Sequence, residues 1–282
     1  MNEVGNIQWF PGHMTKTRRL IEADLKMVDA VVEITDARIP ESSRNPILDE
    51  LVRDKPRIIL MNKCDYADEN VTRAWKQYYE KKGIRVLTCD CRSGKGLNAF
   101  LPEVKRLLAD LIERRKKRGM IGKAIRLMVV GIPNVGKSSF INRMAKTKKT
   151  KVGDRPGVTR GKQWVSIDRD VELLDMPGIL WPKFDDQTAA QRLAFTGAIK
   201  DDVMDTEALA RALGAVLREQ YPELLNARYK LTGDEDILRD IAKSRGMLVS
   251  GGEPDTERAA AALLDEYRGG KIGRITLERP AN

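Results

Sequence analysis

The chain has 282 residues, of which 33% are charged and 41% are hydrophobic, with a formal net charge of +10. This composition is sufficient for one sizeable α/β domain and a smaller second domain, and it excludes a chain that is disordered throughout. There is no leader pattern and no apolar run long enough to span a bilayer, and the three cysteines support neither a disulfide framework nor a zinc site, so we expect a cytoplasmic protein without a membrane partner.

The N-terminal stretch ends in the only histidine of the chain, His13, which follows the turn signal Pro11-Gly12. The spacing of apolar residues then predicts a helix over residues 14–27. Basic side chains near the start of this helix oppose its dipole, so they either contact an acidic partner or form a solvated face.

Two predicted strands, residues 30–35 and 57–61, come next, and the second delivers Asn62-Lys63-Cys64-Asp65. This tetrad at a strand end is typical of a guanine-reading loop. Asp65 can accept hydrogen bonds from both the N1–H and the amine of guanine, whereas adenine has a lone pair at N1. Lys63 would lay its stem over the base, and Asn62 would tie the loop to a phosphate loop. Taken alone, the tetrad could also be a coincidental turn.

A third strand, residues 86–89, precedes Asp90, Cys91 and Arg92. This is where a second base-contacting loop is expected, usually with the sequence Ser-Ala-Lys. Backbone N–H groups could still contact the guanine oxygen. A helix over residues 98–115 follows and ends in a basic run, which indicates a linker or a surface patch.

A buried strand, residues 127–130, leads into the glycine-rich segment 131–138 and then a helix. A glycine, four residues and Gly-Lys-Ser form a phosphate-binding loop, because backbone N–H groups and a lysine surround the phosphates and the serine hydroxyl contacts Mg²⁺. A glycine-rich turn that binds nothing is the alternative. The expected nucleotide contacts here are Asn134, Val135, Gly136, Lys137, Ser138 and Ser139, with Ser138 also a metal ligand.

Two switch segments are predicted beyond this loop. Thr159, in a strongly basic region, would close over Mg²⁺ and the γ-phosphate. After strands over residues 164–167 and 171–174, Asp175 would hold Mg²⁺, and the N–H group of Gly178 would sense the γ-phosphate. The position after this glycine, where GTPases usually carry a water-orienting glutamine, is Ile179.

From residue 197 onward, three apolar stripes at helical spacing predict a small all-α domain. We therefore divide the chain into residues 1–196 and 197–282. The guanine-reading motifs precede the phosphate loop, which is the reverse of their usual order. Motifs in a rotated but otherwise intact cyclic order indicate circular permutation of a P-loop GTPase domain. The predicted fold class is α/β, with a mostly parallel sheet, helices on both faces and ligand loops at the carboxyl ends of the strands.

Residues 7–14, 36–40, 153–157 and 178–183 closely resemble the ribosome biogenesis GTPase A family of circularly permuted GTPases. The resemblance implies GTP and GDP as ligands, with Mg²⁺, and late maturation of the large (50S) ribosomal subunit. The implied partners are the subunit precursor, ribosomal RNA and ribosomal proteins, contacted by a monomer partly through its C-terminal domain. Binding in the GTP state and release on hydrolysis, stimulated by the particle, are also implied.

Ile179 cannot position or deprotonate water, so we hypothesise that His13 does so; the resemblance supports this role. A solvent-exposed or RNA-contacting histidine is the alternative. Asn134 matches an asparagine that helps to hold K⁺ in potassium-stimulated GTPases, where a cation offsets developing charge.

Two other function classes compete with a GTP-hydrolysing assembly factor. One is a nucleotide-gated RNA-binding module whose hydrolysis is incidental. The other, a signalling GTPase with protein partners only, is disfavoured by the basic linker and the basic switch region, since these favour nucleic acid.

Overall fold

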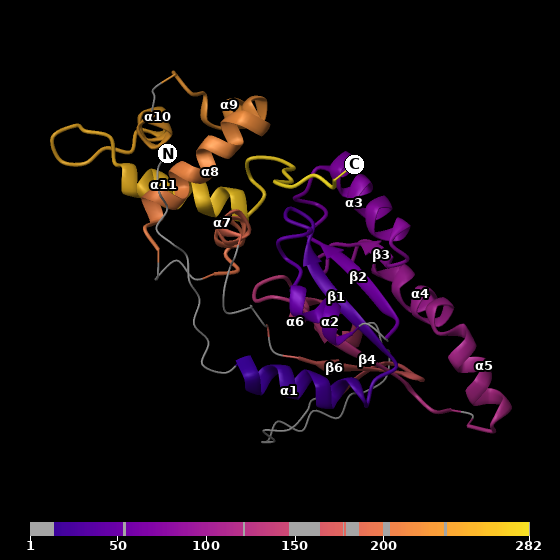
Figure 1. Ribbon diagram of the computed structural model, residues 1–282. Coiled ribbons are helices and arrows are strands. Elements are labelled where there is room, and N and C mark those ends of the chain that lie inside the picture. Colours follow the sequence, from indigo (N-terminus) through magenta and orange to yellow (C-terminus); the bar gives the residue numbers. More distant parts are fainter. Residues whose placement is uncertain are drawn as a thin grey trace.

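A computed structural model of the chain describes residues 14–52, 55–120, 122–146, 164–176, 178, 186–199, 204–233 and 236–281 (Figure 1). Its strands form one six-stranded sheet in the order β3-β2-β1-β4-β6-β5. The strands are β1 (Ala30–Asp36), β2 (Arg57–Asn62), β3 (Arg85–Thr88), β4 (Ile125–Val130), β5 (Trp164–Asp168) and β6 (Val171–Asp175). All neighbours are parallel except β5, which is antiparallel to β6. The predicted mostly parallel sheet is confirmed.

Helices cover both faces of this sheet, because every residue of the central strand β1 is buried and alternate residues of a strand point to opposite sides. On one face, Val32 and Ile34 share a core with Phe100 and Phe140, whose rings meet edge to face at 5.0 Å. On the other face, residues of β1, β2 and β4 pack against the first three helices. The helices of this half are α1 (Met14–Leu25), α2 (Pro46–Leu51), α3 (Glu69–Lys81), the short 3₁₀ helix η1 (Leu97–Ala99), α4 (Phe100–Leu107), α5 (Ala109–Lys117) and α6 (Lys137–Lys146).

The second half is helical, as predicted. It consists of α7 (Gln187–Phe195), α8 (Thr206–Gln220), α9 (Pro222–Tyr229), α10 (Ile237–Arg245) and α11 (Thr256–Arg268). Aspartates cap the starts of α7, α8, α10 and α11 by accepting hydrogen bonds from first-turn N–H groups. One detail differs from the expectation, because the helix expected over residues 98–115 is divided at Leu108. Pro222 begins α9, since proline is tolerated at a first helical position.

The end of the described chain, residues 271–281, returns from α11 to the sheet half and runs beside α3 (Figure 1). The N–H group of Ile275 donates to the Tyr66 carbonyl, and that of Leu277 donates to the Arg38 carbonyl, each at 2.8 Å. The Trp75 indole donates to the Glu278 carbonyl at 3.0 Å. The two halves are therefore held together by α11 and by this segment.

The boundary expected after residue 196 stays a prediction. In the structure, α7 lies before it yet packs against α8 and α11. One apolar core runs through both halves and includes Phe100 of α4 and Leu213 of α8. Among the described residues, no helix is both long and apolar enough to cross a membrane.

Candidate nucleotide-binding site

The predicted ligand loops meet at one edge of the sheet. Strands β2, β3, β4 and β6 run in the same direction, so the segments that follow them emerge at the same, carboxyl edge. These segments are the guanine tetrad, the second base loop, the phosphate loop and the start of the second switch. Parts of the chain that are far apart in sequence thus form one site.

Asn62 joins three of these loops. Its side-chain amide donates to the Val135 carbonyl of the phosphate loop at 2.7 Å, and its Oδ1 accepts from the Cys91 N–H group at 2.9 Å. The phosphate loop passes so close that a Cβ atom on Gly136 would lie 2.2 Å from Asn62 Nδ2. Gly136 also has a φ of 106°, which side chains other than glycine rarely adopt. Close approach and backbone shape both demand glycine here.

Lys137 is buried at the start of α6. Its ammonium donates to the carbonyls of Gly131 at 3.1 Å and Ile132 at 2.9 Å. Burial lowers the pKa of Lys137 to about 8, against the opposing attraction of Asp175. Gly178 lies against the same group, since a Cβ atom there would meet Lys137 Nζ at 2.9 Å and the Pro133 nitrogen at 3.0 Å. The phosphate loop and the second switch are therefore in contact around one lysine.

The oxygen donors near this lysine suit a hard divalent cation. The half-buried Asp175 has its pKa raised by burial, against the attraction of Lys137, and no hydrogen bond to it is formed by the residues that the structure describes. The exposed Ser138, followed by Ser139, lies in the first turn of α6. A carboxylate and a hydroxyl are the ligands that Mg²⁺ prefers beside phosphate oxygens, so these residues fit the ion. Among the residues that the structure describes, no group of three or more His, Cys, Asp or Glu side chains is placed to hold a metal ion.

Asn134 is exposed and has a φ of 58°. Its side-chain amide donates to the Gly197 carbonyl at 2.7 Å, which ties the phosphate loop to the segment after α7. The sequence did not suggest Gly197 as a partner, because the two residues are far apart along the chain.

The rest of the guanine tetrad lies at the end of β2. Burial raises the pKa of Asp65, and the charge of Asp90 adds to this. Lys63 has a φ of 61°, and its ammonium forms an ion pair with Asp36 at 3.0 Å. Asp90 accepts from the Arg92 N–H group at 2.8 Å, while the Cys91 N–H group is bonded to Asn62. The Arg92 N–H group could donate to guanine only if its bond to Asp90 opened, and the Cys91 N–H group only if its bond to Asn62 opened.

Sequence reasoning missed the role of Asp36 and Arg38. Both are almost fully buried, and Arg38 donates to the two oxygens of Asp36 at 3.0 and 2.8 Å. Burial alone would raise the pKa of Asp36, but Arg38 and then Lys63 hold it well below its usual range. The other side of the Arg38 guanidinium donates to the carbonyls of Tyr267 and Arg268, at 3.2 Å each, at the end of α11. A usable signal was present, because an aspartate ends a fully buried strand and an arginine follows it two residues later.

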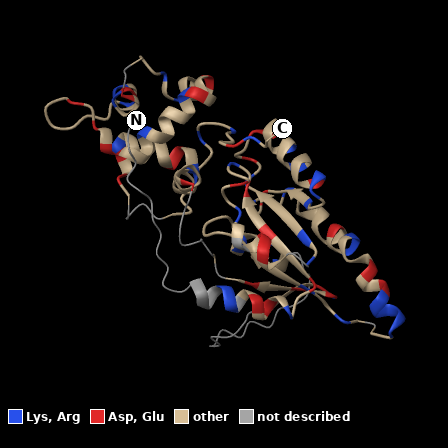
Figure 2. Ribbon diagram, viewed as in Figure 1, with Lys and Arg blue, Asp and Glu red and all other residues tan. Residues whose placement is uncertain are grey.

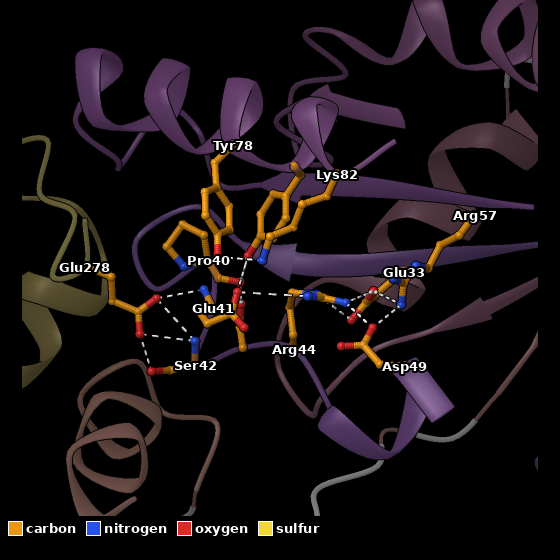
Figure 3. A network of polar contacts seen from close by, with 12 residues as sticks. Glu33, Pro40, Glu41, Ser42, Arg44, Asp49, Arg57, Tyr78, Lys82 and Glu278 are labelled. Carbon is orange, nitrogen blue, oxygen red and sulfur yellow. Dashed lines mark hydrogen bonds and ion pairs between the residues drawn. The ribbon is translucent and has the colours of Figure 1, made fainter. Parts of the chain in front are cut away.

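A second polar network fixes the loop after Arg38 (Figure 3). Arg44 and Arg57 form ion pairs with the buried Glu33 at 3.3 and 3.4 Å, and burial raises the pKa of Glu33 despite both cations. Further along, the N–H groups of Glu41 and Ser42 donate to the Glu278 carboxylate. A hollow of about 570 Å³ lies between this loop, α3 and the residues around Glu278. The loop after Arg38 is therefore held by Glu33 of the sheet and by Glu278 of the returning C-terminal segment.

The proteins that this chain resembles agree with a nucleotide-binding site of this kind. Residues 126–225 match the model of a family described as 50S ribosome-binding GTPases. A ribosome biogenesis GTPase A from Bacillus licheniformis is 48% identical, with 97% of this chain and 98% of the relative covered. One from Thermotoga maritima is 34% identical, with 97% and 95% covered. The chain belongs to the ribosome biogenesis GTPase A family.

Solved structures agree with this family. A GDP-bound YlqF structure matches with a TM-score of 0.67 at 28% identity, covering 94% of this chain and all of that one. The GNP-bound YlqF from T. maritima matches with a TM-score of 0.64 at 30% identity, covering 95% and 99%. As a member of this family, the chain is a circularly permuted GTPase of ribosome biogenesis.

Two predicted site residues, His13 and Thr159, lie outside the described residues, as does Ile179. Their assigned roles stay predictions.

Proposed function

We propose that this GTPase acts in late maturation of the large ribosomal subunit. In this proposal it binds pre-ribosomal RNA and ribosomal proteins of the precursor in its GTP state, as a cytoplasmic monomer, and leaves after hydrolysis. The observation that supports the nucleotide half best is the bridge from Asn62 to Val135 and Cys91, because it holds the base-reading and phosphate-binding loops at one place.

The roles of the site residues follow from their positions. Asp65 would accept from guanine, and the Lys137 ammonium, already aimed into the phosphate loop, would exchange carbonyl partners for phosphate oxygens. Ser138, Asp175 and Thr159 would hold Mg²⁺, which offsets phosphate charge when bound. Gly178 would report the γ-phosphate through its N–H group.

Asp65 carries the choice of base, so Asp65→Asn tests it. An amide replaces one acceptor with a donor, which mismatches guanine but matches the 2-carbonyl of xanthine. We expect GDP affinity to fall by roughly 5- to 150-fold, from about 1–3 kcal/mol for a bidentate pair, and xanthosine diphosphate affinity to rise. The exposed Asp265→Asn is the matched control. Calorimetry that finds the same preference for GDP in both variants would contradict this assignment.

His13 is proposed to orient or deprotonate the attacking water, because Ile179 cannot. The test compares particle-stimulated GTP turnover of His13→Ala with that of the parent. Lost stimulation with intact GTP binding is expected, whereas unchanged turnover would remove His13 from the mechanism.

K⁺ near Asn134 is a further part of the proposal. Its amide nitrogen is bonded to Gly197, so the ion would use the amide oxygen. Equal hydrolysis rates in potassium and sodium buffers would count against it.

The competing function is a nucleotide-gated RNA-binding module with incidental hydrolysis. Single-turnover release from precursor particles distinguishes the two. An assembly factor should stay bound with a non-hydrolysable GTP analogue and leave with GTP, whereas the module should leave at the same rate with either nucleotide.

A further inference from the structure

The end of α5 concentrates positive charge. Residues 114–123 contain six basic residues and no acidic one, although the whole chain has a net charge of only +10. Figure 2 shows this charge at the far end of α5. We call its exposed members the α5 tip: Arg114, Lys116, Lys117, Arg118 and Lys123.

The α5 tip lies at the wrong end of the sheet to serve the nucleotide. The chain passes from α5 into the amino end of β4 at Ile125, whose N–H group donates to the Asp170 carbonyl. The phosphate loop leaves the opposite end of β4, about 20 Å away at 3.3 Å per residue. The tip also points away from α8–α11 (Figure 1). Its charge therefore faces solvent on a separate part of the molecule.

The tip is not neutralised from within the protein. Arg115 is the structural member of the run, because it forms an ion pair with Asp29 at 2.6 Å. Over the described ranges, no carboxylate forms an ion pair with any residue of the α5 tip. Cations only slightly earlier are paired, such as Arg106 with Glu103 and Lys105 with Asp168.

Helix stability accounts for only part of this charge. Cations in the last turn of a helix stabilise it by about 0.3–1 kcal/mol through the dipole. That benefit ends with the last turn at Lys117, whereas Arg118 and Lys123 lie beyond it. Like charges this close also repel each other, so the full cluster is unfavourable in the free protein.

We infer that the α5 tip binds the phosphate backbone of RNA, at a place separate from the nucleotide site and from the helical half. This inference rests on the proposed function for its partner class. Lys and Arg contact phosphates without reading bases, so the contact should be independent of sequence. An anionic membrane is the less favoured partner, because Met120 is the only large apolar side chain exposed on residues 114–120 and 122–123.

The test is a variant that combines Arg114→Gln, Lys116→Gln, Lys117→Gln and Arg118→Gln and keeps Arg115. The matched control removes the same charge from α3 and its C-cap residue Lys82 through Arg73→Gln, Lys76→Gln, Lys81→Gln and Lys82→Gln. In α3, Arg73 and Lys76 have acidic partners, at 3.6 and 3.8 Å. Fluorescence anisotropy would follow binding to a ribosomal RNA duplex over a range of salt concentrations, and GDP binding would report on folding.

Each lost phosphate contact should reduce the slope of log affinity against log salt by about 0.9. In the tip variant, we expect the slope of log affinity against log salt to become shallower by about 2–4. Its RNA affinity at low salt should fall by at least roughly tenfold, and its GDP affinity should not change. A slope equal to that of the α3 control would overturn the inference, as would a parent that does not bind the duplex. Tip-dependent binding to phosphatidylserine vesicles but not to RNA would also overturn it. A parent with tip-dependent RNA binding but no particle-stimulated hydrolysis would instead refute the proposed function alone.

Discussion

At the scale of single residues, the site depends on how closely the phosphate loop approaches Asn62. A methyl group on Gly136 would overlap the amide that bridges to Val135. We expect Gly136→Ala to weaken GDP binding by at least roughly tenfold, because the loop or the amide must move. Gly251→Ala is the control, since Gly251 has a similar φ of 97° but open space around it. Calorimetric GDP affinities that are equal in the two variants would show that the close approach of Gly136 to Asn62 is not needed for nucleotide binding.

Lys137 makes a prediction about pH. Because burial lowers its pKa to about 8, a large fraction of the free protein carries neutral Lys137 at pH 8.5. Phosphates favour the charged form, so GDP binding should take up roughly three quarters of a proton at pH 8.5 and little at pH 7, and affinity should fall as pH rises above 8. Calorimetry in buffers with different ionisation enthalpies measures this uptake. Identical proton uptake at both pH values would contradict the lowered pKa of Lys137.

At the scale of elements, Asp36 and Arg38 connect the guanine tetrad with the end of α11. Arg38→Met would leave the Asp36 carboxylate buried with only Lys63 as its cation. Removing one partner of a buried pair costs about 3–5 kcal/mol, and we expect a loss of this size in urea denaturation. Arg18→Met, which breaks exposed pairs with Glu22 and Glu50, should change stability by less than about 1 kcal/mol.

The same variant should change the response to acid. The pKa of Asp36 is lowered in the folded protein, so its ionised form stabilises the fold above the unfolded pKa and this stability is lost as pH falls. Without Arg38, that lowering is smaller, and the variant should lose less stability than the parent between pH 7 and pH 3. An equal loss in both proteins would show that Arg38 does not hold the charge of Asp36.

The difference between what the sequence predicts and what it misses also appears at this scale. Buried parallel strands and the loops after them are encoded locally, as apolar runs followed by motifs, so the sheet and the meeting of Asn62 with the phosphate loop were predictable. The division of α4 from α5 at Leu108 was not, because the apolar stripe continues through it. The partners of Asp36, Arg38 and Asn134 were also missed, since they depend on which surfaces meet in three dimensions.

At the scale of the whole molecule, permutation leaves the described GTPase motifs at one edge of the sheet, while it changes which segments come before and after them in the chain. The helical half follows the second switch directly, and residues 271–281 then return to the loops after β1 and β2. Contacts from Arg38 and Asn134 reach the helical half from two sides of the nucleotide site. These hydrogen bonds connect the nucleotide loops to the helical half. Such a connection suits a factor whose affinity for a ribosomal particle depends on the bound nucleotide.

This connection predicts cooperative unfolding. One apolar core spans both halves, and Ile275 and Leu277 of the returning segment are buried within it. We expect the parent to unfold in a single calorimetric transition. Combining Ile275→Ala with Leu277→Ala should cost about 2–5 kcal/mol per site and separate the transition into two, as each half loses its support from the other. The control combines Leu248→Ala with Val249→Ala, because these side chains are 54% and 48% exposed and should contribute little. If the buried pair were replaced and one transition remained at the parent's temperature, the returning segment would not be what holds the two halves together.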